Sequence, residues 1–166
     1  MLNPLDAPDA VSAAAELLED LLDDVNHVSS ISLSPVVPVA GTAPGRDRMK
    51  GLAQAVYDAG RSGHQLRTLV DPLESPQAWR DILRREVTDG FMQPAIRYAR
   101  PNPRTPVELR KPGELAAGIA DLIEAHLGPV RSCGDVTGPD TGDLWCRRLL
   151  LVTDDWAAIL HFGFSD

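Results

Sequence analysis

The sequence predicts an α+β domain: an antiparallel sheet that ends in a C-terminal β-hairpin, with helices packed on the sheet. The strongest indication is residues 144–164, which have the pattern of two strands joined by a turn at Asp154 and Asp155. Positions 149–152 are all apolar, as in a strand that is covered on both faces. A predicted helix at 112–127 followed by three consecutive strands is typical of the same fold class.

Residues 8–28 are predicted to form an acidic amphipathic helix. Its apolar residues recur at helical spacing: Val11, Ala14, Leu18, Leu21, Leu22, Val25 and Val28. The carboxylates lie away from this stripe. Since soluble proteins seldom expose such a stripe, we expect it to be buried against the rest of the fold or a second copy of the chain. Its centre is the predicted partner-binding surface: Leu18, Leu21, Leu22 and Val25.

Composition divides the chain into three predicted parts. Residues 1–30 form an acidic N-terminal helical extension, and 31–45 form a proline-rich linker with a short edge strand near residues 31–33. Residues 46–166 form a single α+β domain. The further elements predicted within it are helices at 46–59, from Ser75-Pro76 to about Gly90, and at 112–127, and strands at 65–70 and 130–133.

The formal net charge of −8 argues against binding to nucleic acids or anionic membranes, because a polyanion would be repelled. Residues 1–30 hold seven acidic residues and no Lys or Arg, whereas 31–111 hold 13 basic and 8 acidic residues. Docking of the acidic first segment onto the Arg-rich middle, within one chain or in a homodimer, is therefore an electrostatically favourable arrangement. Phosphate binding by that middle segment is the alternative.

The first residues lack the basic start and apolar run of a secretory signal, and no stretch of about 18 apolar residues is present to span a membrane. The sequence therefore predicts a cytoplasmic protein. In that compartment Cys133 and Cys146 should be free thiols.

The chemically interesting residues lie near the C-terminus. Cys133 and Cys146 have twelve residues between them, and His126 or His161 could complete a metal site. Zinc sites usually contain a Cys pair two to four residues apart, so neither a metal nor another cofactor is predicted. The low-ranked catalytic hypothesis is a nucleophile, base and carboxylate formed by Cys133, His161 and Asp154.

The favoured functional hypothesis is a small acidic cytoplasmic protein-binding module: an adaptor, a chaperone-like protein or an immunity-type inhibitor that recognises a basic or apolar partner surface. The acidic charge, the apolar helical stripe and the lack of catalytic motifs support it. The alternative is a small-ligand-binding protein or enzyme with a Cys/His pocket, which would use Cys133, His161 and Arg147 or Arg148.

Overall fold

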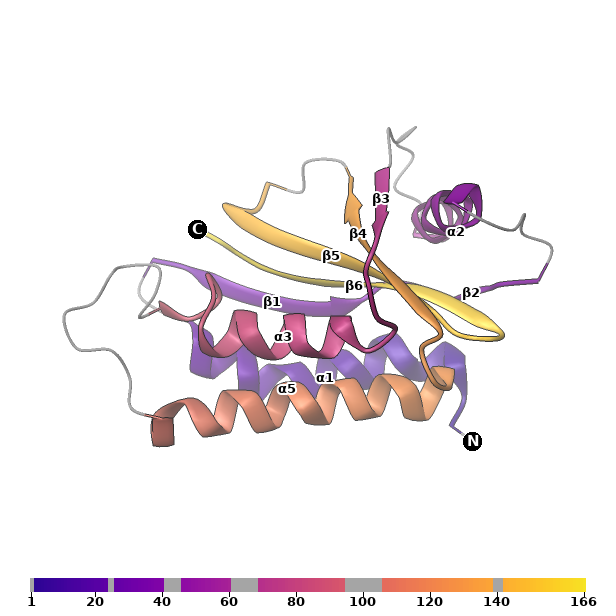
Figure 1. Cartoon of the computed structure of the whole chain (residues 1–166). Coiled ribbons are helices and arrows are strands. Elements are labelled where there is room, and N and C mark those ends of the chain that lie inside the picture. Colours follow the sequence, from indigo (N-terminus) through magenta and orange to yellow (C-terminus); the bar gives the residue numbers. More distant parts are fainter. Residues whose placement is uncertain (1, 24–25, 41–45, 61–68, 95–105, 139–141) are drawn as a thin grey trace.

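The computed structural model describes residues 2–23, 26–40, 46–60, 69–94, 106–138 and 142–166 (Figure 1). Within these residues, four α-helices pack on a six-stranded antiparallel sheet, which confirms the predicted α+β class. The helices are α1 (Ala7–Leu22), α2 (Arg46–Ala59), α3 (Ala78–Thr88) and α5 (Pro106–Leu127), and the 3₁₀ turn η1 (Pro4–Asp6) precedes α1. The strands are β1 (Val28–Leu33), β2 (Val37–Pro38), β3 (Leu69–Pro72), β4 (Ser132–Thr137), β5 (Trp145–Val152) and β6 (Trp156–Ser165).

The C-terminal strand β6 is a central strand of the sheet. The strand order is β1-β6-β5-β4-β3, and β2 pairs with β6 beyond the end of β1. Strands β5 and β6 form the predicted hairpin, and their register runs from Trp145 opposite Phe164 to Val152 opposite Ala157. Two hydrogen bonds close the turn: Thr153 N donates to Trp156 O at 2.8 Å, and Trp156 N donates to Thr153 Oγ1 at 3.0 Å.

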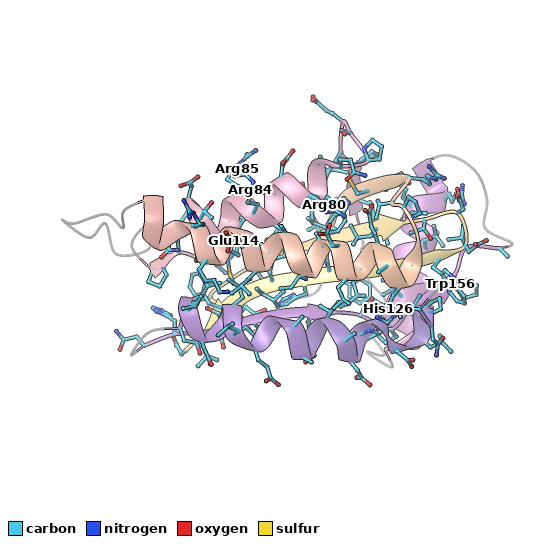
Figure 2. All side chains as sticks on the ribbon, turned by 90° about the horizontal axis from the view of Figure 1, so that it is seen from below. Arg80, Arg84, Arg85, Glu114, His126 and Trp156 are labelled. Carbon is cyan, nitrogen blue, oxygen red and sulfur yellow. The ribbon has the colours of Figure 1, made fainter. Side chains whose placement is uncertain are left out.

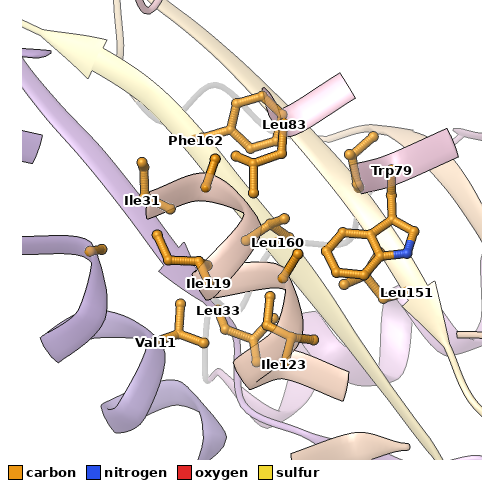
Figure 3. Close-up of a cluster of buried hydrophobic side chains, with 14 of the residues drawn as sticks. Val11, Ile31, Leu33, Trp79, Leu83, Ile119, Ile123, Leu151, Leu160 and Phe162 are labelled. Atoms are coloured by element: carbon orange, nitrogen blue, oxygen red, sulfur yellow. The ribbon is translucent and has the colours of Figure 1, made fainter. Parts of the chain in front are cut away.

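Helices α1, α3 and α5 cover one face of the sheet, which we call the three-helix face (Figure 1). The sheet side chains on this face include Leu149, Leu151, Leu160 and Phe162, all completely buried. Figure 3 shows Leu151, Leu160 and Phe162 among helix residues such as Val11, Trp79, Leu83, Ile119 and Ile123. Leu149 and Leu151 of the apolar run 149–152 therefore belong to this core, and Trp156 packs against it while partly buried.

Helix α2 lies on the opposite side of the sheet, which we call the α2 face (Figure 1). There Leu150 and Val152 of β5 pack with Leu52, Ala53 and Val56 of α2. Alternate residues of 149–152 therefore enter different apolar clusters, which explains why the sequence is apolar at every position.

The N-terminal helix ends at Leu22, earlier than the predicted residue 28. The backbone of Asp23 is extended, and its carboxylate accepts a hydrogen bond at 2.6 Å from the backbone N of Ser29 in the edge strand β1. Leu18 and Leu22 are completely buried against α5 and the sheet of the same chain. This is one of the two arrangements predicted for the apolar stripe. Leu21 is half-buried, and Val25 lies outside the described residues.

Other boundaries differ by a few residues. Helix α5 begins at Pro106, six residues before the predicted start, and so contains Pro112 in its interior. Strand β4 begins at Ser132 instead of residue 130, and β3 begins at Leu69, while 65–68 lie outside the described residues. Helix α2 occupies the predicted range 46–59.

The Arg-rich helix α3 pairs with α5. Arg80 contacts Asp121 through Nη1 at 2.7 Å and Glu124 through Nη2, whereas Arg84 and Arg85 are exposed (Figure 2). Among the described residues, the acidic partners of Arg80 therefore come from α5 and not from the N-terminal segment. No helix in the described part of the chain is both long enough and apolar enough to cross a membrane.

Candidate ligand-binding site

The sheet separates the three residues of the catalytic hypothesis. Cys133 of β4 lies on the three-helix face, where its Sγ donates to Ser75 O at 3.3 Å and burial raises the pKa of its thiol. His161 follows Leu160 along β6 and therefore lies on the α2 face. Asp154 belongs to the β5-β6 turn and accepts hydrogen bonds from Nε and Nη2 of Arg131. The structure does not bring the three together.

The two cysteines are also on opposite faces. Cys146 is opposite Gly163 in the β5-β6 ladder and lies on the α2 face, two residues before Arg148. Both cysteines are free thiols, as predicted. His126 is on α5, where its Nδ1 lies 2.7 Å from Asn3 O. A site that combines Cys133 and Cys146 with either histidine is therefore not formed.

The structure instead brings together polar residues at one end of the α2 face. Ser32, His161 and Arg148 are paired neighbours on β1, β6 and β5 and form a row across the sheet. Helix α2 ends at Ala59, and its buried apolar residues cover the other end of the face. The α2 face is therefore apolar beneath α2 and polar beyond it.

Arg148 is the central residue of this polar end. It is only 7% exposed, and its guanidinium donates from Nη1 to Tyr57 Oη and from Nη2 to Cys146 Sγ, both at 3.5 Å. Gly138 approaches it closely, since a Cβ there would lie 2.5 Å from Arg148 Nη1 and 2.6 Å from Tyr57 Oη. The end of β4 thus packs directly against the arginine.

His161 contacts Asp143 with a distance of 3.3 Å between Nε2 and Oδ2. Burial lowers the pKa of His161 below its usual value; the carboxylate of Asp143 opposes this shift, and the charge of Arg148 adds to it. The neutral imidazole is therefore the main form at about pH 7, available as both a hydrogen-bond donor and an acceptor.

Two hollows adjoin Arg148. One has a volume of about 180 Å³, with polar walls that include Ser32, Tyr57, Arg148 and His161 and apolar walls that include Val56 and Ile159. The other, of about 480 Å³, lies where β4 separates from β5, beyond the last pair of their ladder. Arg148 borders both, so a ligand in either could reach its guanidinium.

Sequence reasoning identified His161 and Arg148 but missed Tyr57, Ser32 and Asp143 as their neighbours. The sequence did contain one indication that Arg148 and His161 are neighbours, because they lie equally far from the predicted turn at Asp154 and Asp155. That turn alone places the two residues opposite each other. Tyr57 and Ser32 come from elements whose pairing no local pattern indicates.

Comparison with known protein families, with curated proteins and with solved structures finds no match to this chain. Its function is therefore inferred from the residues of the site alone.

Proposed function

We propose that the chain is a small-ligand-binding protein that takes an anionic ligand in the cavity beside Arg148. The observation that carries this proposal is Arg148, a residue only 7% exposed that borders a cavity of about 180 Å³. A guanidinium holds several donors in a fixed plane, which matches the oxygens of a carboxylate or phosphate. The attraction between the guanidinium and a bound anion acts at short range in a partly buried site. It therefore outweighs the weaker repulsion between the anion and the net negative charge of the chain.

The other walls of the cavity restrict the ligand. The hydroxyl of Ser32 and the imidazole of His161 offer hydrogen bonds beside the guanidinium, and Val56 and Ile159 offer an apolar surface. A volume of about 180 Å³ is below that of typical drug-sized pockets, about 300–1,000 Å³. The ligand that fits is a compact acid with a short apolar part.

Calorimetric titration of the full chain with short carboxylic acids and with inorganic phosphate tests the proposal. The informative variant is Arg148→Met, which keeps a long side chain but removes the charge. Because a charge-assisted hydrogen bond contributes about 1.5–3 kcal/mol, we expect Arg148→Met to weaken binding about tenfold or more.

The matched control is Arg84→Met, since Arg84 is exposed on α3 on the other side of the sheet. It should bind as the wild type does. Failure of every tested acid to bind, or equal binding by the wild type and Arg148→Met, would refute the proposal.

A second candidate function, recognition of a basic partner protein, is favoured by the outer face of α1. Glu16 and Asp20 are exposed there on either side of Leu17, which is 51% exposed, and residues 1–30 contain no Lys or Arg. An exposed apolar side chain beside two carboxylates suits a basic protein surface. This face replaces the predicted one, because Leu18 and Leu22 are covered by the chain itself.

A photo-crosslinking residue at position 17 would test this second function in cells. A basic protein should be captured at that position, and capture should fail when Glu16→Lys and Asp20→Lys are combined. Capture that is unaffected by the charge reversal would exclude the α1 face as the binding surface.

A further inference from the structure

Three side chains with metal-binding atoms meet near the start of β5. Asp143 offers a carboxylate oxygen, Cys146 a sulfur and His161 a ring nitrogen, and these atoms all lie within 4.8 Å of one another. All three residues are half-buried. Within the described residues, this is the one group of three His, Cys, Asp or Glu side chains whose ligand atoms lie this close together.

The distances are close to those of a tetrahedral zinc site. Bonds of about 2.0–2.1 Å from zinc to nitrogen and oxygen put those two ligand atoms about 3.3 Å apart. His161 Nε2 and Asp143 Oδ2 are already 3.3 Å apart. With a zinc–sulfur bond of about 2.3 Å, the sulfur of Cys146 should lie about 3.5 Å from each of them, so a side-chain movement of about 1 Å completes the site.

The backbone provides a firm base for two of the ligands. Cys146 and His161 are on adjacent strands and on the same face, and the residue opposite Cys146 is Gly163. A Cβ at Gly163 would lie 2.7 Å from Cys146 Cβ and 2.5 Å from Trp145 O. Glycine at this position lets β6 approach the backbone of β5 this closely, which brings the two ligand-bearing strands together.

We propose that Asp143, Cys146 and His161 bind a divalent transition-metal ion, with zinc the best fit, through three protein ligands and one coordination position left for water or an exogenous ligand. A thiolate and an imidazole select zinc-like ions over magnesium and calcium, which require mostly oxygen ligands. Three protein ligands with one open position are the arrangement of zinc sites that exchange a ligand.

The nearby arginine is compatible with this site. Arg148 Nη2 donates to Cys146 Sγ at 3.5 Å, so its guanidinium lies beside the ligand sulfur. A thiolate and a carboxylate together cancel the two positive charges of the ion, so Arg148 faces a neutral centre. The metal site shares His161 with the cavity of the proposed anion binding, so anion binding is measured on the metal-free chain.

The test uses the full chain, freed of metal with a chelator and then titrated with zinc in competition with a chromophoric chelator. Cobalt is added in a parallel titration, because bound cobalt shows a thiolate charge-transfer band and the intense visible bands of a tetrahedral centre. We expect one equivalent of metal and a cobalt spectrum that includes the thiolate band.

Two variants and one matched control identify the ligands. Cys146→Ser and His161→Gln should each weaken zinc binding at least tenfold, and the first should also abolish the thiolate band. Cys133→Ala removes the other thiol, which lies on the opposite face, and should leave both readouts unchanged. Circular dichroism of each metal-free variant shows whether it is folded.

Absence of one-equivalent binding in the wild type would overturn the proposal. Persistence of the thiolate band in folded Cys146→Ser, or its loss in folded Cys133→Ala, would do the same. Anion binding to Arg148 is measured in the presence of chelator, so failure of the metal site and failure of the proposed function are distinguishable.

Discussion

The two faces of the sheet differ in how completely they are covered. On the three-helix face, α1, α3 and α5 enclose a continuous apolar core that includes Trp79, Leu160 and Phe162. On the α2 face, α2 is the one helix among the described residues and covers one end, and the other end carries Arg148 and His161 beside a cavity. The first face stabilises the fold, and the second has room for a ligand.

The same two strands build both faces. Along β6, Leu160 and Phe162 enter the core while Ile159 and His161 point to the other side. Because strand residues alternate between faces, one hairpin fixes the site relative to the core without an additional element. Changes on either face therefore test this division of roles.

Removal of residues 155–166 should have the largest effect, which is complete loss of folding. The deletion eliminates β6, the strand that pairs with β1, β2 and β5. Each large core side chain lost costs about 2–5 kcal/mol, and the total stability of a domain is about 5–15 kcal/mol. Circular dichroism and solution mass should show an unfolded or aggregated chain; a soluble monomer that unfolds cooperatively would contradict this expectation.

A matched pair of substitutions compares the faces directly. Leu160→Ala and Ile159→Ala alter adjacent residues of β6, with Leu160 completely buried and Ile159 4% exposed. Both should lower the free energy of unfolding by about 2–5 kcal/mol, with Leu160→Ala at the upper end. Ile159 borders the cavity and so has fewer neighbours to lose. Urea denaturation measures both, and a larger loss for Ile159→Ala would argue against the comparison.

Two arginine–aspartate pairs of similar geometry should differ in their contribution. Arg147 donates to both oxygens of Asp135 at 2.8 Å and lies 3.6 Å from Glu86 of α3, with its side chain 31% exposed. Arg147→Met should cost about 1–3 kcal/mol. Arg131→Met breaks a pair with Asp154 in which the side chains are 59% and 67% exposed, and should cause no measurable loss in the same urea experiment. Equal losses would contradict this explanation.

The smallest effect concerns pH. Because the folded-state pKa of His161 is lowered mainly by burial, protonation is easier in the unfolded chain, whose histidine has a pKa of about 6.5. This contribution to stability is complete above that value and is lost as the pH falls through the folded-state pKa. His161→Gln should therefore lose less stability than the wild type between about pH 7.5 and 5.5. An identical decline in both proteins would show that His161 is not responsible.

The sequence predicts the fold better than the site. Alternation and turn residues were sufficient to predict the β5-β6 hairpin, because this pattern is local. The position of α1 in the core and the meeting of Tyr57 with Arg148 depend on packing between distant segments. The catalytic hypothesis grouped Cys133 and Asp154 with His161 by residue type alone. In the structure Cys133 and His161 lie on opposite faces of the sheet, and Asp154 lies in the β5-β6 turn.

The rates at which the two cysteines react with an alkylating reagent test most directly whether one face is sealed and the other open. Cys133 is 2% exposed on the three-helix face, whereas Cys146 is half-buried at the polar end of the α2 face. In the metal-free native protein, Cys146 should react directly, and Cys133 should react at least about a hundredfold more slowly, because it must await opening of the core. Peptide mapping by mass spectrometry gives both rates. Reaction of Cys133 as fast as Cys146 would contradict the distinction between the faces.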